Sequence, residues 1–322
     1  MTNDKVTFGV GWGTDMHPIQ HVELSILADS LGFNGVWPGD TPTSRSAGHD
    51  PHILLSYIAG HTKHIKLGTA VYVLPLSHPV RLAKQLVTLD MLSNGRTILG
   101  VGPGGEFAKQ FEAFGIPVNE RGPRTDEYIQ LMRKLWTDPT VYFHGRFFNL
   151  DGITMEPKPV QKPIPIWIGG RPGGKELGPD GKPRRKSRTA AIRRAALYGD
   201  GWIPYYMSIE SYRESVQEIR EIAKSSGRDP AAIKMSLNNF FFIGDSYEEA
   251  LKRAYGPRGA PPIPLERVVD YDFIGTAKEL IPRIEKFIEA GCRDFVCKLE
   301  SPNEQIAKHM KYLAKEVIPH FT

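Results

Sequence analysis

Short runs of β-forming residues alternate along this chain with longer stretches of helical periodicity, and this alternation constrains the fold more than any other feature. A β-rich run at 6–11 precedes a stretch in which Ile19, Val22 and Ile26 recur at helical spacing until Gly32 ends it. The same order then repeats to the end of the chain. We predict strands at 6–11, 35–38, 65–73, 97–100, 166–168, 201–203, 234–243 and 294–298. Strands that are separated by helices indicate a parallel sheet of the α/β class.

Eight strand and helix units in 322 residues favour one closed (β/α)8 barrel, a TIM barrel, over residues 1–322. A doubly wound open sheet is the alternative. Barrels of this length fold as one domain when insertions lengthen their loops, and we expect insertions near 138–165, 171–188 and 255–275. Functional residues of such a barrel gather where its strands end.

Composition excludes several classes of protein. No apolar run approaches the ~18 residues that a membrane span needs, and residues 1–5 lack the apolar core of a signal peptide, so we expect a cytoplasmic protein without membrane contact. The formal net charge of +5 lies partly in a basic cluster at 182–194, which favours a local anionic ligand over nucleic acid. Cys292 and Cys297 are too close for a useful disulfide, and we expect inert core thiols.

One glycine-rich stretch matches the dinucleotide-binding pattern G-x-G-x-x-G. It runs from Gly100 to Gly105 and follows a predicted strand. The acidic residue expected about 20 positions further on would be Glu120, but no second strand leads into it. The glycines therefore suit a backbone that closely approaches either its neighbour or a flat ligand.

Histidines occur in three close pairs. These are His17 with His21, His49 with His52, and His61 with His64. No nearby acidic residue completes a zinc-type ligand set, so we expect no metal site. A serine triad is not indicated either, because no serine lies in a G-x-S-x-G elbow. His49 differs from the others because it shares a loop after the second predicted strand with Arg45 and Asp50.

The helix that begins at Pro79 is apolar on two sides. One stripe contains Val80, Ala83, Val87 and Met91, and the other contains Leu82, Leu86 and Leu89. The barrel would cover one stripe. We expect a second subunit to cover the other, which predicts a homodimer.

The order of several sequence blocks resembles that of the bacterial luciferase-like family of flavin and deazaflavin oxidoreductases. The blocks are ADSLGFNGVWPGD at 28–40, LGTAVYVLPLSHP at 67–79, AKQLVTLDMLSNGRTILGVG at 83–102, ERGPRTD at 120–126, PKPVQKPIPIWIGG at 157–170 and YGDGW at 198–202. Members share a (β/α)8 barrel. The resemblance covers nearly the whole chain, and several blocks in the right order are more specific than any one of them.

This resemblance implies a cofactor site. Ala70 and Val71 would form the non-prolyl cis peptide that members place behind the central ring of the cofactor. Gly102 and Gly104 would pass close to that ring. Backbone N–H groups and charge for the phosphate would come from Gly169, Gly170 and Arg171, together with part of the loop 182–188.

The cofactor implied by the resemblance is coenzyme F420, a deazaflavin, with FMN as the alternative. Many deazaflavin members carry an Asp-His pair after the second strand, whereas here Asp40 is followed by Thr41. The variant with Ser or Thr after the aspartate is one that we associate with deazaflavin members. The long basic loop at 175–188 also suits a more anionic tail than that of FMN.

We therefore expect an F420-dependent oxidoreductase that moves hydride to or from a small organic substrate. A two-component monooxygenase that takes reduced FMN from a separate reductase is the alternative. A third possibility is a flavin-binding protein without turnover, or a non-redox barrel lyase.

Candidate site residues lie at predicted strand ends. Asp40 and Glu106 would control the reacting end of the cofactor, and His49 would donate the proton because the usual histidine is absent at Thr41. Four aromatic residues would form the walls of the substrate pocket. They are Trp12, Tyr72, Trp202 and Tyr205.

Overall fold

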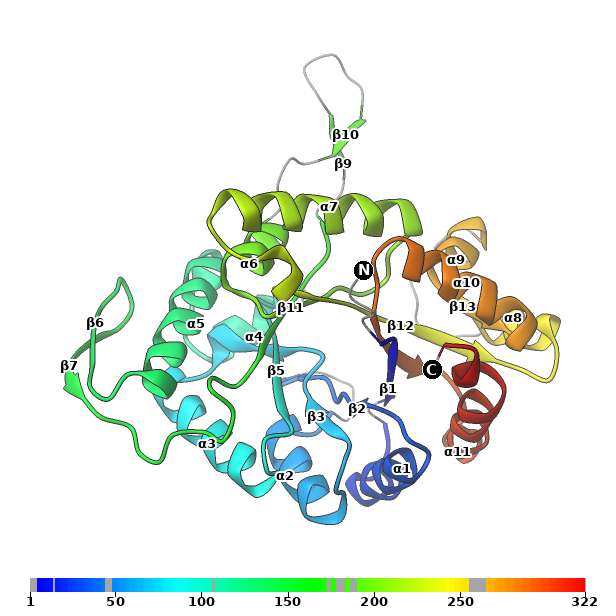
Figure 1. The fold of residues 1–322 in the computed structure, drawn as a ribbon, viewed down its shortest axis with the longest axis horizontal. Helices are drawn as coiled ribbons and strands as arrows, with labels where there is room; N and C mark the ends of the chain where they lie inside the picture. The colour runs from blue at the N-terminus through cyan, green and yellow to red at the C-terminus, as the bar shows by residue number, and fades with distance from the viewer. Residues whose placement is uncertain are drawn as a thin grey trace.

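Eight parallel strands close into a ring at the centre of the computed structural model (Figure 1). The structure describes residues 5–13, 15–43, 48–105, 108–172, 175–177, 183–185, 190–254 and 265–321. The ring consists of β1 (Thr7–Trp12), β2 (Gly35–Val36), β3 (Lys66–Gly68), β5 (Thr97–Gly102), β8 (Ile166–Gly169), β11 (Gly201–Ile203), β12 (Lys234–Ile243) and β14 (Asp294–Leu299). Pairing of β14 with β1 and of β11 with β12 closes it. The fold is the predicted TIM barrel, and an open doubly wound sheet is excluded.

Helices surround the strands (Figure 1). They are α1 (Pro18–Ser30), α2 (Pro51–His61), α3 (Pro79–Leu92), α5 (Arg121–Thr137), α6 (Ala190–Tyr198), α7 (Ile209–Ser225), α10 (Ala277–Glu289) and α11 (Asn303–Tyr312). Local chemistry sets their ends. At the start of α2, for example, the Asp50 carboxylate accepts hydrogen bonds from the N–H groups of His52 and Ile53. None of the described helices is long and apolar enough to cross a membrane.

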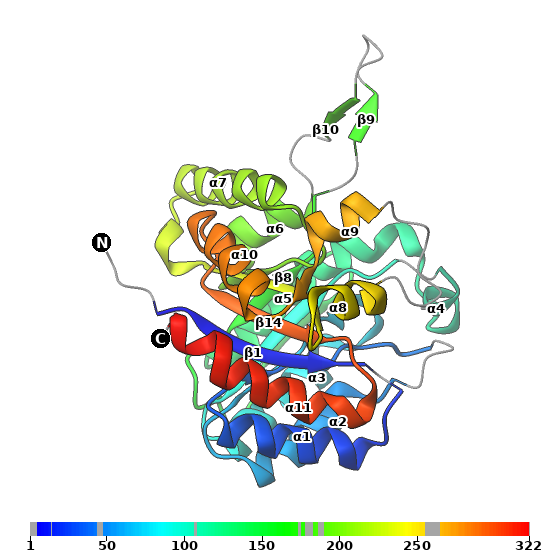
Figure 2. The ribbon, with the colours of Figure 1, turned by 90° about the vertical axis from the view of Figure 1, so that its right-hand side faces the viewer.

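Several further elements extend the loops. In Figure 2 the strand arrows point toward the side that carries α4 (Ala108–Ala113), α8 (Tyr247–Ala254) and α9 (Leu265–Tyr271). Two strands lengthen the sheet on that side, β4 (Tyr72–Val73) beside β5 and β13 (Phe273–Gly275) beside β12. Two antiparallel hairpins pair only with themselves among the described strands, β6 (Val141–His144) with β7 (Asn149–Ile153) and β9 (Lys175–Leu177) with β10 (Pro183–Arg185).

The interior of the barrel is filled by a small apolar cluster, hereafter the interior cluster. It consists of Trp37, Ile98, Trp167, Ile203 and Val296. The two indole rings stack with centroids 5.0 Å apart. Gly9, Gly35 and Gly68 on three adjacent strands make room for them, because a Cβ at any of these positions would lie within 3.0 Å of the Trp37 indole. The barrel is thus a packed core below its mouth.

The single strand expected at 65–73 is interrupted. β3 ends at Gly68 and β4 begins at Tyr72, and between them the chain leaves the ladder. There the Ala70 N–H donates to the Pro38 carbonyl and the Thr69 hydroxyl donates to the Gly100 carbonyl. The predicted strand is therefore wrong in its middle, because Ala70 bonds to the loop after β2 and the Thr69 side chain bonds to β5.

Helix α3 is covered within its own chain. Its buried apolar residues are Leu82, Ala83, Leu86, Val87 and Leu89. The helix packs against α2 and α5 as well as the sheet, and the Trp136 indole N–H of α5 donates to the Ala83 carbonyl at 3.2 Å. Most of both stripes is therefore buried within the chain, because a barrel helix has two helical neighbours in addition to the strands. The stripes no longer indicate a second subunit, and the homodimer stays a prediction.

Candidate functional site

The carboxyl ends of the strands bring distant segments together at the mouth of the barrel, on the side that α4, α8 and α9 border in Figure 2. One part of the mouth lies at the ends of β2, β3, β5 and β8. The other lies at the ends of β11, β12 and β14. The candidate residues divide between these two parts.

Residues 69–72, hereafter the shelf, form the first part of the mouth. The peptide bond between Ala70 and Val71 is cis, as the family resemblance predicted. Backbone hydrogen bonds hold the shelf to the loop after β2, since Ala70 N–H donates to the Pro38 carbonyl at 3.0 Å and Asp40 N–H donates to the Val71 carbonyl at 3.3 Å. The hydroxyl of Thr69 fixes its other side to β5, donating to the Gly100 carbonyl at 2.7 Å. The shelf is therefore anchored from both neighbouring strands.

Glycines at the ends of β5 and β8 accommodate the side chain of Val71. A Cβ at Gly102 or Gly169 would lie within 3.0 Å of a Val71 methyl group. Val71 also packs on the interior cluster below. The glycine at 102 was expected to let a cofactor ring approach; what it accommodates in the structure is Val71. Gly104, with a φ of +61°, leaves room for Val73 in the same way.

Asp40 lies beside the shelf in a partly buried position. Its carboxylate accepts a hydrogen bond from the Val73 N–H at 2.9 Å. Burial raises the pKa of this carboxyl from 3.8 to about 6, the hydrogen bond from Val73 opposes that shift, and the nearby Asp50 adds to it. Asp40 borders a cavity of about 290 Å³, with Thr41 and Tyr72 among the other lining residues. It can therefore exchange a proton near neutral pH.

Two polar atoms near Asp40 are buried and have no hydrogen-bond partner among the described residues. They are Thr41 Oγ1 and His52 Nε2. The His52 ring packs on Tyr72 with centroids 4.5 Å apart, and burial lowers its pKa to about 4, so it is neutral at pH 7. Sequence reasoning missed His52, although its position at the first turn of a helix that follows a rim loop was the available signal.

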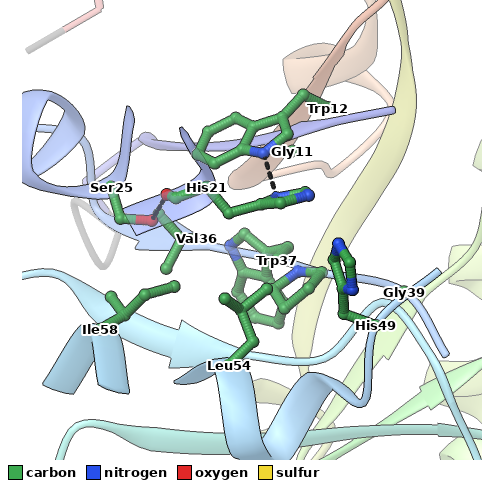
Figure 3. Close-up of a pocket in the computed structure, with 11 residues that line it drawn as sticks. Gly11, Trp12, His21, Ser25, Val36, Trp37, Gly39, His49, Leu54 and Ile58 are labelled. Carbon is green, nitrogen blue, oxygen red and sulfur yellow. Dashed lines mark hydrogen bonds between the residues drawn. The ribbon is translucent and has the colours of Figure 1, made fainter. Parts of the chain in front are cut away.

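His49 belongs to a second, smaller cluster, which Figure 3 shows. Its Nε2 lies 2.8 Å from the Met16 carbonyl, and because a carbonyl only accepts, this nitrogen carries the proton. Its ring meets His21 edge to face at 5.5 Å. Burial, and then the proximity of His49, lowers the pKa of His21 to about 4. Because His49 also lines the Asp40 cavity, it connects the two clusters.

Trp12 faces helix α1 and not the mouth of the barrel. Its indole N–H donates to Nδ1 of His21 at 2.5 Å (Figure 3). The cavity beside these residues has a volume of about 20 Å³, which is room for about one water molecule. The prediction that Trp12 forms a wall of the substrate pocket is therefore wrong.

Trp202 also faces the helix layer. It is fully buried and stacks on Tyr212 of α7 with ring centroids 5.2 Å apart. Its neighbour Ile203 belongs to the interior cluster, and successive strand residues face opposite sides. Trp202 is therefore not a pocket wall. Tyr205, by contrast, lies at the rim and is 36% exposed.

The segment after β8 joins the mouth to helix α6. Gly170 has a φ of +111°, and a Cβ there would lie 3.0 Å from Ala191 in the first turn of α6. Arg171 follows, with its guanidinium carbon 5.2 Å from the ring centroid of Tyr205. A helix start beside a cation suits an anionic group. The basic side chains at 182–188, which were expected to help bind the phosphate, are not among the side chains that the structure describes.

Other candidates give no further site. Glu106 lies outside the described residues, as does Arg45. The described part of the chain contains no cluster of three His, Cys, Asp or Glu side chains that could hold a metal ion. Cys292 and Cys297 are buried, and burial raises the pKa of both thiols, which keeps them protonated.

The sequence and the structure of this chain were compared with those of known proteins. An F420-dependent glucose-6-phosphate dehydrogenase of Kineococcus radiotolerans is 25% identical over 332 residues, which cover 94% of this chain and 93% of that protein. An FMNH2-dependent dimethylsulfone monooxygenase of Pseudomonas putida is 31% identical over 206 residues, covering 63% of this chain and 51% of that protein. Among solved structures, an F420-dependent secondary alcohol dehydrogenase superposes with a TM-score of 0.81 at 21% identity, over 99% of each chain.

A family model covers most of the chain. The model described as luciferase-like monooxygenase matches residues 6–177 and 186–314. Together with the barrel and the cis peptide at its mouth, this match means that the chain belongs to the luciferase-like monooxygenase family and is an oxidoreductase of the flavin- or deazaflavin-dependent kind.

Proposed function

We propose that this enzyme uses coenzyme F420 and transfers hydride to or from a carbon of a small organic substrate. The shelf carries the proposal. It presents backbone and the small side chain of Ala70, and glycines border it at the ends of β5 and β8. Such a surface suits the face of a planar ring. The residues present therefore fit a flavin or deazaflavin ring.

The anionic tail of the cofactor has a matching place beyond the shelf. We assign it to Gly169, Gly170 and Arg171, where the first turn of α6 supplies N–H groups and Arg171 supplies positive charge. Gly170 brings the backbone close to the first turn of α6, which supports assigning one phosphate group to both. Phosphate binding of this kind serves either cofactor.

The preference for F420 over FMN rests on the relatives. The F420-dependent relative matches this chain over nearly its full length, and the FMN-dependent relative matches over a shorter stretch. A full-length match includes β11, β12 and β14, which complete the mouth. This supports a hydride-transfer enzyme over an oxygen-using one.

Proton handling falls to residues around the Asp40 cavity. When bound, F420 supplies a ring carbon that accepts or donates hydride. During oxidation of an alcohol, the Asp40 carboxylate accepts the proton of the substrate hydroxyl, and in the reverse direction it returns that proton to the carbonyl oxygen. A pKa of about 6 suits both directions. We assign His49 the second proton-transfer position, because it lines the same cavity.

Cofactor titration followed by an anaerobic assay tests this proposal. Purified protein is titrated with F420 and with FMN by calorimetry, and the reduction of bound F420 is then followed with a panel of secondary alcohols and aldehydes. We expect F420 to bind at least tenfold more tightly than FMN and to be reduced by one of the alcohols. Tighter binding of FMN, or the absence of any F420 binding, would contradict the proposal.

The second candidate function is an FMN-dependent monooxygenase, favoured by the identity of 31% to the Pseudomonas putida enzyme. This function needs a separate reductase that supplies reduced flavin. Oxygen consumption by the protein mixed with reduced FMN and a substrate panel distinguishes it, because hydride transfer to or from F420 consumes no oxygen.

A further inference from the structure

The second part of the mouth contains a lysine that points into the barrel. Val296 of β14 belongs to the interior cluster, and side chains two residues apart on a strand face the same side. Lys298 therefore faces the interior one layer nearer the mouth. In the sheet it pairs with Gly11 of β1 on one side and with Phe240 of β12 on the other. Because Gly11 has no side chain, no side chain of β1 lies directly beside Lys298.

Lys298 lies against an aromatic ring at this position. Its ammonium nitrogen lies 4.8 Å from the centroid of the Phe240 ring, which is cation–π distance. Lys298 is partly buried, and its ammonium group lies at the mouth beside this ring. A cation held in this way attracts an anionic group that enters the mouth.

Aromatic residues continue from Phe240 around the rim. We call these the aromatic wall, which consists of Tyr205, Tyr206, Phe240 and Tyr271. Tyr206 stacks on Tyr271 with centroids 4.8 Å apart and meets Phe240 edge to face at 6.3 Å. Tyr205 is exposed and the other three residues are partly exposed.

Backbone geometry at the wall points to function. Tyr206 has a φ of +54°, a left-handed conformation that a bulky residue rarely adopts. Such residues concentrate at ligand sites, where the surrounding structure enforces them. Here the conformation places the ring of Tyr206 between Phe240 and Tyr271.

We infer that the aromatic wall binds the body of the substrate and that Lys298 binds an acidic group on it. The substrate class is then a small organic anion, a carboxylate or a phosphate ester, with a flat or apolar body. This inference rests on the proposed function, because it places the substrate across the mouth from the shelf. Stacking on the wall and pairing with Lys298 would orient the substrate toward the cofactor.

Calorimetric titration with three probe compounds tests the inference. Benzoate and phenyl phosphate carry the two acidic groups, and benzamide is the neutral match. Titrations use the free protein and the protein saturated with whichever cofactor it binds. We expect at least one acid to bind at least tenfold more tightly than benzamide. Whether benzoate or phenyl phosphate binds better identifies the acidic group.

Variants at Lys298 assign the preference to this residue. Lys298→Met should reduce the preference for the acid to less than threefold, and Lys298→Arg should retain it. Lys308→Met is the matched control, because Lys308 is an exposed lysine that pairs with Asp245 on the surface, and it should behave as wild type. Circular dichroism confirms that each variant is folded.

Three outcomes would overturn the inference. The first is that the acids bind no better than benzamide, or do not bind at all. The second is that Lys298→Met keeps the wild-type preference for the acid. The third is that Lys298→Met loses affinity for the cofactor, which would assign the lysine to the cofactor. Failure of the proposed function gives a different result. In that case the wild-type protein fails to bind F420, while the free protein still prefers the acid.

Discussion

The two parts of the barrel mouth are built by different means. On the shelf side, backbone hydrogen bonds and missing side chains set the shape, as the bonds of Ala70 and the glycines at 102 and 169 show. On the opposite side, large side chains set it, as the stacking of Tyr206 and the position of Lys298 show. The shelf therefore tolerates little change in side-chain size. On the aromatic wall, by contrast, we expect a substitution to alter the shape of the surface more than the course of the backbone.

This difference assigns the two parts different tasks. A cofactor that is the same in every turnover suits a surface made by backbone, because side-chain rotamers do not alter it. A substrate that distinguishes one enzyme from another suits a surface made by side chains, which single substitutions can change. We therefore expect changes on the shelf side to affect every substrate equally and changes on the wall side to affect substrates unequally.

The largest effect is expected from Gly102→Val. The added side chain needs the space of a Val71 methyl group, so it displaces the shelf. Cofactor affinity should fall at least 100-fold, roughly 3 kcal/mol, and calorimetry measures it. Gly60→Ala is the control, because Gly60 lies in helix α2 with no atom near its Cβ position, and it should bind as wild type. Binding by Gly102→Val within threefold of wild type would mean that the shelf does not form the ring site.

A smaller loss, about 100-fold in kcat/KM, is expected from Asp40→Asn. The Asn oxygen still accepts from the Val73 N–H, so the fold is retained, but the side chain no longer accepts a proton. Cofactor affinity should stay within threefold of wild type. A variant that keeps more than a tenth of the wild-type kcat/KM would place the proton acceptor elsewhere.

Stability measurements give a second test of Asp40. Its folded pKa of about 6 lies above the ordinary 3.8, so between these pH values the folded protein holds a proton that the unfolded chain has released. The free energy of unfolding of the wild type therefore falls as pH rises from about 4 to 6, by on the order of 2–3 kcal/mol from this group. Asp40→Asn lacks this fall and should be the more stable protein at pH 7. Urea titrations of both proteins at pH 4 and pH 7 measure how the free energy of unfolding changes with pH. The same change in the wild type and in Asp40→Asn would refute the raised pKa of Asp40.

The fold could be predicted from the sequence because its signal is repeated. All eight predicted strands are present in the ring, and the boundaries predicted for β12 are those observed. The shelf was also accessible, since the cis bond between Ala70 and Val71 followed from a family block. Each strand and the cis bond could be predicted because the pattern that indicates it lies within one short stretch of the sequence.

The direction of side chains at strand ends could not be predicted in the same way. Barrel strands are buried on both faces, so their apolar runs do not indicate which residues point inward. Trp12 and Trp202 were assigned to the pocket for this reason, yet both face helices. Lys298 was overlooked because its place at the mouth depends on pairing with Phe240, which is far away in the sequence. Register of this kind is a tertiary property.

The smallest effect is expected at Arg171, which lies between the two parts of the mouth. Its guanidinium lies over Tyr205 of the aromatic wall. In the sequence Arg171 directly follows Gly170 of the proposed tail site. Because Arg171 is exposed, solvent and salt weaken its attraction for an anion. Arg171→Gln should therefore weaken cofactor binding about fivefold, roughly 1 kcal/mol at low ionic strength, and the difference should shrink as salt is added.

Calorimetric titration of the cofactor at low and at high salt measures this change at Arg171. Arg220→Gln is a suitable control, because it removes the same charge from helix α7 away from the mouth and should leave the affinity unchanged. If Arg171→Gln changes only the binding of benzoate or phenyl phosphate, the arginine belongs to the substrate side. If added salt does not reduce the loss of cofactor affinity, Arg171 acts at the boundary between the two parts through its packing on Tyr205 and not through its charge.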